Sequence, residues 1–206
     1  MKRDPQENAR ALYEVAAMQA GYFTAAQALD IGYAYSQQHF HVARGNWLRV
    51  DRGLFRLRDF PAGEREDLVR WSLWSRNREG IVQAVVSHET ALVVHELGDV
   101  MPARIHLTVP PSFQRGIPPG CVIHRDELAS GDTEVHDGYQ VTTPLRTLLD
   151  VAESPLSQEH LNDAVRDALT RGLVPRHLLE TASSSPAAQS RVKQALAAAL
   201  QEEASE

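Results

Sequence analysis

The stretch 36–58, SQQHFHVARGNWLRVDRGLFRLR, changes its residue pattern at Gly45, and this change limits the possible folds more than any other feature of the sequence. Before the glycine, the residues suit a helix that a glycine ends. After it, apolar residues alternate with arginines on both sides of Asp51-Arg52-Gly53, which suits a three-residue hairpin loop with glycine where positive φ is needed. The pattern predicts a helix followed by two antiparallel strands, over residues 47–50 and 54–58.

Two further helices are predicted upstream of this stretch. The first carries an apolar stripe at helical spacing and ends before a glycine at position 21. In the second, Thr24 and Gln27 have the spacing of a capping box, and Gly32 ends the helix. Ser36 can cap the third helix. Helix, short helix, glycine turn and helix is the helix-turn-helix pattern, in which the last helix enters the major groove of DNA.

The two predicted strands form a wing. Leu48 and Val50 share one face of the first strand, Phe55 and Leu57 share one face of the second, and the arginines fall on the opposite faces. We therefore expect a winged helix-turn-helix whose wing packs with its apolar face and presents arginines to solvent.

These residue types suit DNA. Glutamine, asparagine and arginine on the third helix can hydrogen-bond base edges in the major groove, whereas the arginines of the wing suit phosphates or a narrow minor groove. The predicted DNA-binding residues are Thr24, Ser36, Gln37, Gln38, His41, Arg44, Asn46, Arg49, Arg52, Arg56 and Arg58.

The charge distribution agrees with a polyanion as partner of the N-terminal part. The formal net charge of the chain is -6, but residues 1–60 carry +2 and the remainder carries -8. Within residues 31–58 the only acidic group beside five arginines is Asp51. Double-stranded DNA is thus the expected partner of residues 1–60 and not of the acidic remainder.

Residues 61–206 are predicted to form a second, α+β domain. Its central strand is expected where Ile105, Leu107 and Val109 alternate with His106 and Thr108, and helices are expected from about residue 144 onward. The predicted fold class is α+β: an N-terminal winged helix-turn-helix over residues 1–60, then a mixed domain with C-terminal helices.

Several classes of protein are disfavoured. The sequence has no apolar run of membrane-spanning length and a polar start, so we expect a soluble, cytoplasmic protein with no membrane partner. Cys121 is the only cysteine, which excludes an internal disulfide and a cysteine-rich zinc site. His88 and His95 are seven residues apart, unlike the spacing of four in zinc hydrolases, and are expected in the core or at a cap. No catalytic residue, metal or cofactor is predicted.

The segments SHETALVVHELGDVMPARIHLTVP and DGYQVTTPLRTLLDVA resemble the AbiEi-type antitoxins of bacterial type IV toxin-antitoxin systems, with a match over roughly residues 22–152. The resemblance implies a winged helix-turn-helix followed by an antitoxin module. It also implies an antitoxin, related to phage defence, that represses its own operon by binding inverted repeats in the promoter. Such an antitoxin opposes a nucleotidyltransferase-fold toxin, usually without a stable complex.

The motif residues of this module are Ser87, His88, Thr143, Arg146 and Asp150. Ser87 and Thr143 are expected to cap helices. Arg146 and Asp150 stand four residues apart and can pair along a helix. Both a structural role and direct contact with a partner remain open for this polar group.

Three alternatives remain open at this stage. A winged helix can serve protein contacts instead of DNA. The chain can be a stand-alone transcriptional regulator whose second domain senses a ligand. It can also be an antitoxin that phosphorylates its toxin, although the only two lysines lie near opposite ends and no G-x-G motif is present.

Overall fold

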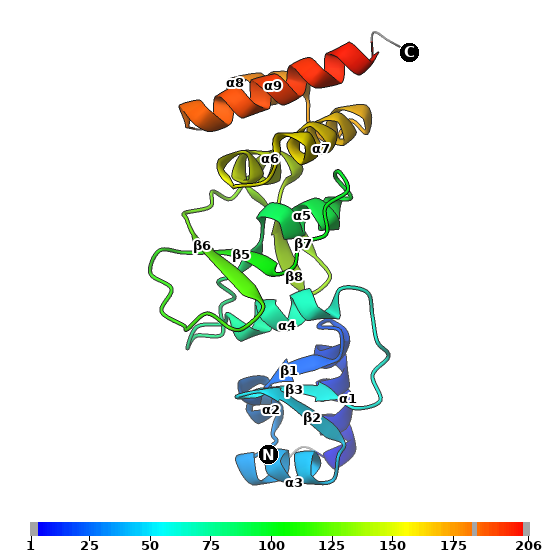
Figure 1. The fold of residues 1–206 in the computed structure, drawn as a ribbon. Helices are drawn as coiled ribbons and strands as arrows, with labels where there is room; N and C mark the ends of the chain where they lie inside the picture. Colours follow the sequence, from blue (N-terminus) through cyan, green and yellow to red (C-terminus); the bar gives the residue numbers. More distant parts are fainter. Residues whose placement is uncertain (1–3, 183–184, 204–206) are drawn as a thin grey trace. The chain divides into compact units, whose positions relative to one another are not determined.

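The computed structural model of the protein describes residues 4–182 and 185–203. The chain divides into two compact units (Figure 1). The first comprises residues 1–84 with 135–139, and the second comprises residues 85–134 with 140–206.

The first unit is a winged helix-turn-helix. Thr24 accepts a hydrogen bond from the backbone N–H of Gln27, whose side chain accepts from the N–H of Thr24, so the predicted capping box starts the second helix. Gly32, with φ +121°, ends that helix as predicted. The elements of this unit are α1 (Pro5–Ala17), β1 (Tyr22–Thr24), α2 (Ala25–Ile31), α3 (Tyr35–Ala43), β2 (Trp47–Asp51), β3 (Leu54–Leu57) and α4 (Glu66–Trp74).

The wing differs in detail from its prediction. Asp51 pairs with Leu54, so the loop has two residues, and a register shift between Arg49 and Asp51 accommodates one extra residue. Gly53 has φ +70°, as its place in the turn requires. The strand β1, which the sequence pattern did not reveal, pairs with β3 and completes a three-stranded antiparallel sheet in the order β1-β3-β2.

The core of the first unit is built around an aromatic group. The indole of Trp47 lies 4.8 Å from the ring of Phe23 and 5.1 Å from that of Tyr33, both nearly edge-on. Trp47 is 4% exposed, whereas Leu48 is 37% exposed. The predicted inward face of β2 is therefore wrong by one residue, because the larger indole takes the buried side and turns Leu48 outward.

The first unit extends beyond residue 60, where the sequence pattern placed a domain boundary, to Ala84. The reason is α4, which packs with β1. Glu66 of α4 pairs with Arg56 of the wing at 2.9 Å, and Arg76 donates to the side chain of Gln19 at 2.9 Å.

Most of a mixed sheet in the order β6-β5-β4-β8-β7 belongs to the second unit, whereas residues 135–136 of β7 and residue 139 of β8 are counted with the first. Strand β4 runs antiparallel to β5 and parallel to β8, while β5 runs parallel to β6. The strands are β4 (Val85–Val86), β5 (Ile105–Val109), β6 (Cys121–Arg125), β7 (Thr133–His136) and β8 (Tyr139–Thr142).

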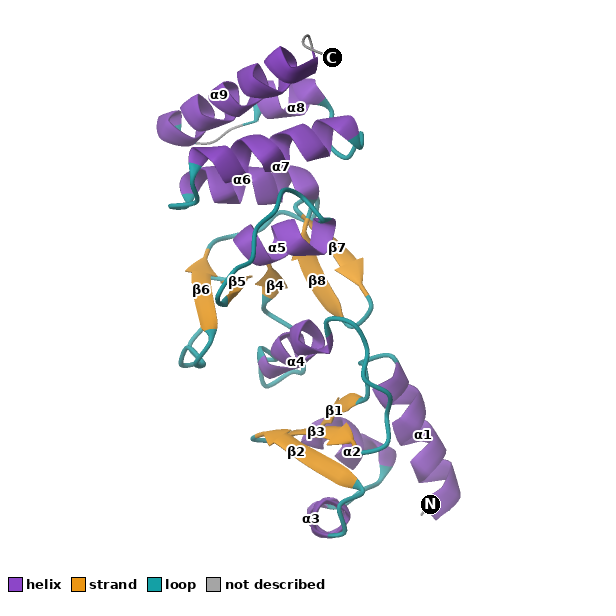
Figure 2. Ribbon diagram, turned by 45° about the vertical axis from the view of Figure 1, so that its right-hand side comes forward, coloured by secondary structure: helices purple, strands orange, loops and turns teal. Residues whose placement is uncertain are grey.

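Helices cover this sheet and continue into a helical layer (Figure 2). Helix α5 packs with β5 and α6, and α9 lies along α7. Buried leucines, valines and alanines from α5, α6, α7 and α9 form one core. The helices are α5 (His88–His95), α6 (Pro144–Glu153), α7 (Gln158–Thr170), α8 (Arg176–Thr181) and α9 (Pro186–Glu203). The predicted α+β class with C-terminal helices is confirmed.

Strand β5 is covered on both faces. Leu107 is buried as predicted, but Thr108 is only 1% exposed although the alternation placed it on the opposite side. Its hydroxyl donates to Oγ of Ser87 at 2.8 Å. The polar residue Thr108 in this alternating strand therefore belongs to a buried hydrogen-bond network, and the face that carries it is not exposed to solvent.

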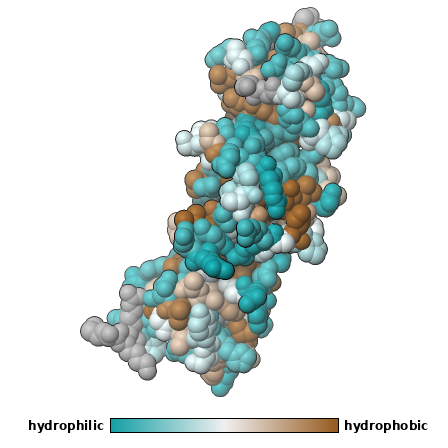
Figure 3. Space-filling view, turned by 90° about the vertical axis from the view of Figure 1, so that its left-hand side faces the viewer, coloured by the Kyte–Doolittle hydropathy of each residue, from teal (hydrophilic) through white to brown (hydrophobic). Residues whose placement is uncertain are grey.

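Within residues 4–182 and 185–203, none of the helices combines the length and the apolar composition needed to cross a membrane. Figure 3 shows one face of the molecule, on which hydrophilic residues predominate and hydrophobic ones form separate patches.

Candidate functional site

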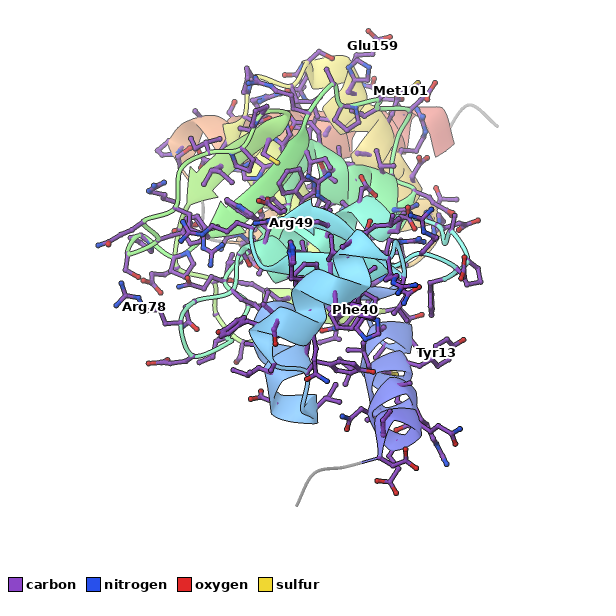
Figure 4. All side chains as sticks on the ribbon, turned by 90° about the horizontal axis from the view of Figure 1, so that it is seen from below. Tyr13, Phe40, Arg49, Arg78, Met101 and Glu159 are labelled. Atoms are coloured by element: carbon purple, nitrogen blue, oxygen red, sulfur yellow. The ribbon has the colours of Figure 1, made fainter. Side chains whose placement is uncertain are left out.

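The first candidate surface consists of α3 and the wing. Ser36, Arg44, Arg49 and Arg52 are exposed. The three arginines form no ion pair with any residue that the structure describes, and the guanidinium of Arg44 lies 5.1 Å from the centre of the Phe40 ring. Figure 4 views this surface from below, with Phe40 on α3 and Arg49 of β2 beside it. The exposed cations of α3 and the wing are therefore available to a polyanion.

Gln38 was predicted to read bases, and this is wrong. It is 3% exposed, and its Nε2 donates to the carbonyl oxygens of Tyr33 at 2.9 Å and Ala25 at 3.1 Å. These carbonyls belong to the turn between α2 and α3 and to the start of α2. Gln38 therefore fixes the angle between the two helices and cannot reach DNA.

Gln37 and His41 of α3, and Asn46 shortly after the helix, take part in local structure. Helix α3 begins at Tyr35 with Ala34 as its N-cap, so Ser36 is not the cap, and Gln37 accepts from the N–H of Ala34 instead. His41 stacks on Trp47, with ring centres 4.7 Å apart, and its Nδ1 lies 3.2 Å from Nδ2 of Asn46. Burial lowers the pKa of His41.

The wing arginines fall into two groups. Arg56, 12% exposed at its side chain, pairs with Glu66 and donates to the carbonyl of Pro61, so its predicted presentation to solvent is wrong. Arg58 is exposed but donates to the carbonyl of Gly45. Arg49 and Arg52 keep the predicted outward position. Thr24 serves as the N-cap of α2.

The second candidate site is a pocket of about 440 Å³ in the second unit. Strands β5 and β6 and helices α5 and α6 supply its walls. The lining residues are His88, Thr108, His124, Arg125, Asp126, Arg146, Leu149, Asp150 and Glu153.

Arg146 organises the charges of this pocket. Its Nε donates to Asp150 Oδ1 at 2.7 Å, its Nη1 lies 3.1 Å from Asp132, and its Nη2 pairs with Asp126. The pair with Asp150 was predicted, but the two other carboxylates come from a loop whose position the sequence could not reveal. Thr143 caps α6 by accepting from the N–H of Arg146, as predicted.

Among the residues that line the pocket, Asp150 has a buried oxygen that lacks a hydrogen-bond donor. Its side chain is 7% exposed, and its Oδ2 accepts no hydrogen bond from any residue within the described part of the chain. Burial raises the pKa of Asp150 to about 6, although Arg146 opposes this rise. A buried carboxylate oxygen without a donor is costly, so it requires a reason.

His88 has an unusual backbone conformation. Its φ is +52°, a left-handed value that few residues other than glycine adopt, and residues held in this way often lie at functional sites. Burial, reinforced by the neighbouring His124, lowers the pKa of His88 to about 3. The ring is therefore uncharged at neutral pH.

Two further histidines extend the network. The rings of His88 and His124 stack with centres 3.4 Å apart, and His124 Nε2 lies 3.2 Å from His106 Nδ1. His106 Nδ1 also lies 2.7 Å from a carboxylate oxygen of Glu89. Burial raises the pKa of Glu89, but the hydrogen bonds from His106 and the backbone, together with the charge interactions with His106 and His88, lower that pKa to about 2.

Sequence reasoning missed His106 and His124. Each is on a strand of the pair β5 and β6, and the register places them close together on one face. A histidine in each of two successive apolar strands was the only available signal, and without the register it could not be interpreted.

The arrangement of Ser87, His88 and Asp150 is not that of a nucleophilic triad. Ser87 Oγ lies 3.0 Å from Nδ1 of His88, and the Asp150 carboxylate lies 4.0 Å from the same nitrogen. A triad needs the serine and the carboxylate on opposite ring nitrogens. Ser87 is also fully buried and does not cap α5 with its side chain.

No group of three or more histidine, cysteine, aspartate or glutamate side chains among residues 4–182 and 185–203 could hold a metal ion. His95, seven residues after His88, is buried elsewhere, with its Nε2 2.7 Å from the carbonyl of Thr142. This agrees with the expected core position of His95.

Fold and pocket together define a two-part protein, a winged helix-turn-helix unit followed by an α+β module with a buried polar network. Residues 83–200, more than half of the sequence, match the model of the AbiEi antitoxin C-terminal domain. The chain therefore belongs to the AbiEi antitoxin family. This membership supports a role as the antitoxin of a toxin-antitoxin system.

Among solved structures, the chain is similar to the RV2827C protein from Mycobacterium tuberculosis, with a TM-score of 0.61 and 15% sequence identity. The similarity covers 97% of this chain and 79% of that protein, and at this identity it shows the fold alone. No curated protein matches the sequence.

Proposed function

We propose that this antitoxin belongs to a type IV system, that it neutralises a nucleotidyltransferase-fold toxin, and that it represses its own operon by binding inverted repeats. The observation that carries the proposal is the presence of both parts in one chain. The second unit matches the antitoxin domain, and the first presents exposed arginines on α3 and the wing. The expected location is the cytoplasm, and the expected biological role is phage defence.

The division of charge supports two different partners. Residues 1–60 carry a net charge of +2 and the remaining residues carry -8. Phosphate contacts need exposed cations such as Arg44, Arg49 and Arg52, whereas an acidic module suits a basic protein partner.

We propose further that neutralisation involves no covalent chemistry. The geometry of Ser87, His88 and Asp150 supports this, because it does not activate the serine. Arg146 is saturated by three carboxylates and is a poor anchor for a phosphate group.

The test combines growth and promoter activity. The gene next to this one is expressed in a heterologous bacterium with and without the full chain, and a reporter is placed behind the operon promoter. We expect restored growth and a repressed reporter. Mass spectrometry of the surviving toxin checks for a covalent adduct, and a phosphorylated toxin would contradict the non-covalent proposal.

The pocket in the second unit also favours a second candidate, a regulator that senses a small ligand. The two candidates differ in the growth assay. A neighbouring gene that is harmless without this chain, together with a reporter that responds to metabolites, would favour the regulator.

A further inference from the structure

The pocket in the second unit contains an acceptor that lacks a donor. Asp150 lines the cavity, and its Oδ2 is buried and receives no hydrogen bond from the described residues, while Oδ1 is held by Arg146. Asp150 has no freedom to turn this oxygen toward solvent, because Arg146 fixes the carboxylate through its other oxygen. A ligand that donates a hydrogen bond into the cavity would satisfy it.

The charges around the cavity indicate the sign of that ligand. Four carboxylates, those of Asp126, Asp132, Asp150 and Glu153, lie in the pocket or on Arg146, against the two guanidinium groups of Arg125 and Arg146. The histidines add no positive charge, since burial lowers the pKa of both His88 and His124. The pocket therefore favours a cation over a phosphate or a carboxylate.

The dimensions fit a single side chain. A cavity of about 440 Å³ is at the small end of ligand pockets. Flat imidazole rings and the aliphatic Leu149 lie in its wall, and a guanidinium or the stem of a lysine can lie against such groups.

We infer that this pocket is a receptor for one basic side chain, an arginine or a lysine presented by the toxin, whose charged head donates to Asp150. The inference rests on the proposed function, because it assigns the toxin's contact to this module. It names Asp150 as the recognition residue and Arg146 as the group that positions its carboxylate. A toxin with a basic surface would thus meet the acidic module.

The first arm of the test uses a small probe and the full chain. N-acetyl-L-arginine amide is titrated while the ring signals of the histidines are followed by NMR. N-acetyl-L-citrulline amide, which has the same shape and no charge, is the matched ligand. We expect saturable shifts at His88 and His124 with the arginine probe only. In Asp150→Asn the binding should weaken roughly tenfold or more, as expected for loss of a charge-assisted hydrogen bond.

The matched protein control is Asp99→Asn, which removes the same charge from an exposed position of the same unit outside the pocket. It should bind the probe as the wild type does. Circular dichroism and thermal melting of both variants verify that each is folded.

The second arm measures neutralisation of the neighbouring toxin in growth assays. Wild type and Asp99→Asn should restore growth, and folded Asp150→Asn should fail or need much higher expression. Probe binding combined with full neutralisation by Asp150→Asn would overturn the inference in favour of a free small cation. Equal affinity for the arginine and citrulline probes would also overturn it. Failure of the wild type to restore growth would instead reject the proposed function, whatever the probe does.

Discussion

Nε of Arg146 donates to Oδ1 of Asp150 one helical turn away, at 2.7 Å, and the same guanidinium holds Asp126 and Asp132. One cation therefore pairs with three carboxylates, from α6 and from the loop after β6. Removing one partner of a buried pair costs far more than the pair contributes, because the remaining charge is left unpaired.

Arg146→Ala should lower the free energy of unfolding by about 2 to 4 kcal/mol, somewhat less than a fully buried pair because Asp126 remains half in solvent. Urea denaturation followed by circular dichroism measures this. Arg146→Lys should recover only part of the loss, since an ammonium cannot make three directed contacts in one plane. A change below about 0.5 kcal/mol for the alanine variant would contradict the role assigned to this cation.

His88 should make the protein sensitive to acid. The ordinary pKa of histidine is 6.5 and that of folded His88 is about 3, so between these values only the unfolded chain takes up the proton. Its contribution to stability is complete above pH 6.5 and is lost as the pH falls toward 3. Asp150 has the opposite effect on stability. Its pKa is raised from the ordinary 3.8 to about 6, so between these values the folded state holds the proton more tightly, and the contribution of Asp150 to stability rises as the pH falls.

His88→Asn should reduce this loss, and asparagine tolerates the positive φ at this position. The measurement is the urea midpoint of wild type and variant at pH 7.5 and pH 4.5. We expect the urea midpoint of the variant, taken relative to that of the wild type, to be higher at pH 4.5 than at pH 7.5. His177→Asn, at an exposed position of α8, is the control and should show no such shift.

Alanine substitutions of Gln38, on α3, and of Arg44, directly after it, should have different effects. Gln38→Ala leaves two carbonyl oxygens without their donor and should cost about 1 to 3 kcal/mol of stability. Arg44→Ala should leave the melting temperature nearly unchanged and weaken binding to the operator. Thermal melting and fluorescence anisotropy on promoter DNA separate the two effects. Normal operator affinity of the Arg44 variant would remove this residue from the DNA interface.

The wing gives a test of phosphate contact. Changing Arg49 and Arg52 together to alanine should reduce the slope of log affinity against log salt by about one unit for each lost phosphate contact. Binding to a scrambled duplex should weaken as much as binding to the operator. Arg56→Ala is the comparison, since Arg56 is paired with Glu66 and should change stability more than the slope. An unchanged slope in the double variant would show that the wing does not touch phosphate.

Leu107 and Thr108 test the two-sided burial of β5. Leu107→Ala should cost about 2 to 5 kcal/mol, as expected for a fully buried leucine. Thr108→Val keeps the volume but removes the hydroxyl that donates to Ser87, and should cost about 1 kcal/mol. Chemical denaturation at neutral pH gives both numbers. No effect of the valine variant would mean that the hydroxyl contact is not formed in solution.

Local rules predicted much of the first unit. The capping box at Thr24, the glycine that ends α2 and the hairpin at Gly53 are fixed by neighbours in the sequence, so they could be found without a structure. Burial of Gln38 could not be found, because its acceptors become available only when α2 and α3 are folded together. Arg56 was misjudged for the same reason, since its partner Glu66 lies on α4.

The second unit shows the same limit at its pocket. The i,i+4 pair of Arg146 and Asp150 follows from helical spacing alone. The proximity of His88, His106 and His124 depends on the register of β5 and β6, for which the sequence has no local signal.

The tryptophans of the chain, Trp47, Trp71 and Trp74, all lie in the first unit, and none lies in the residues of the second. Tryptophan fluorescence therefore monitors the winged helix-turn-helix and α4, and it contains no tryptophan signal from the antitoxin module. Unfolding followed by fluorescence and by far-ultraviolet circular dichroism would give one coincident curve if the two units melt together. Separated curves would assign a distinct stability to each unit in the intact chain, without cutting it or adding a dye.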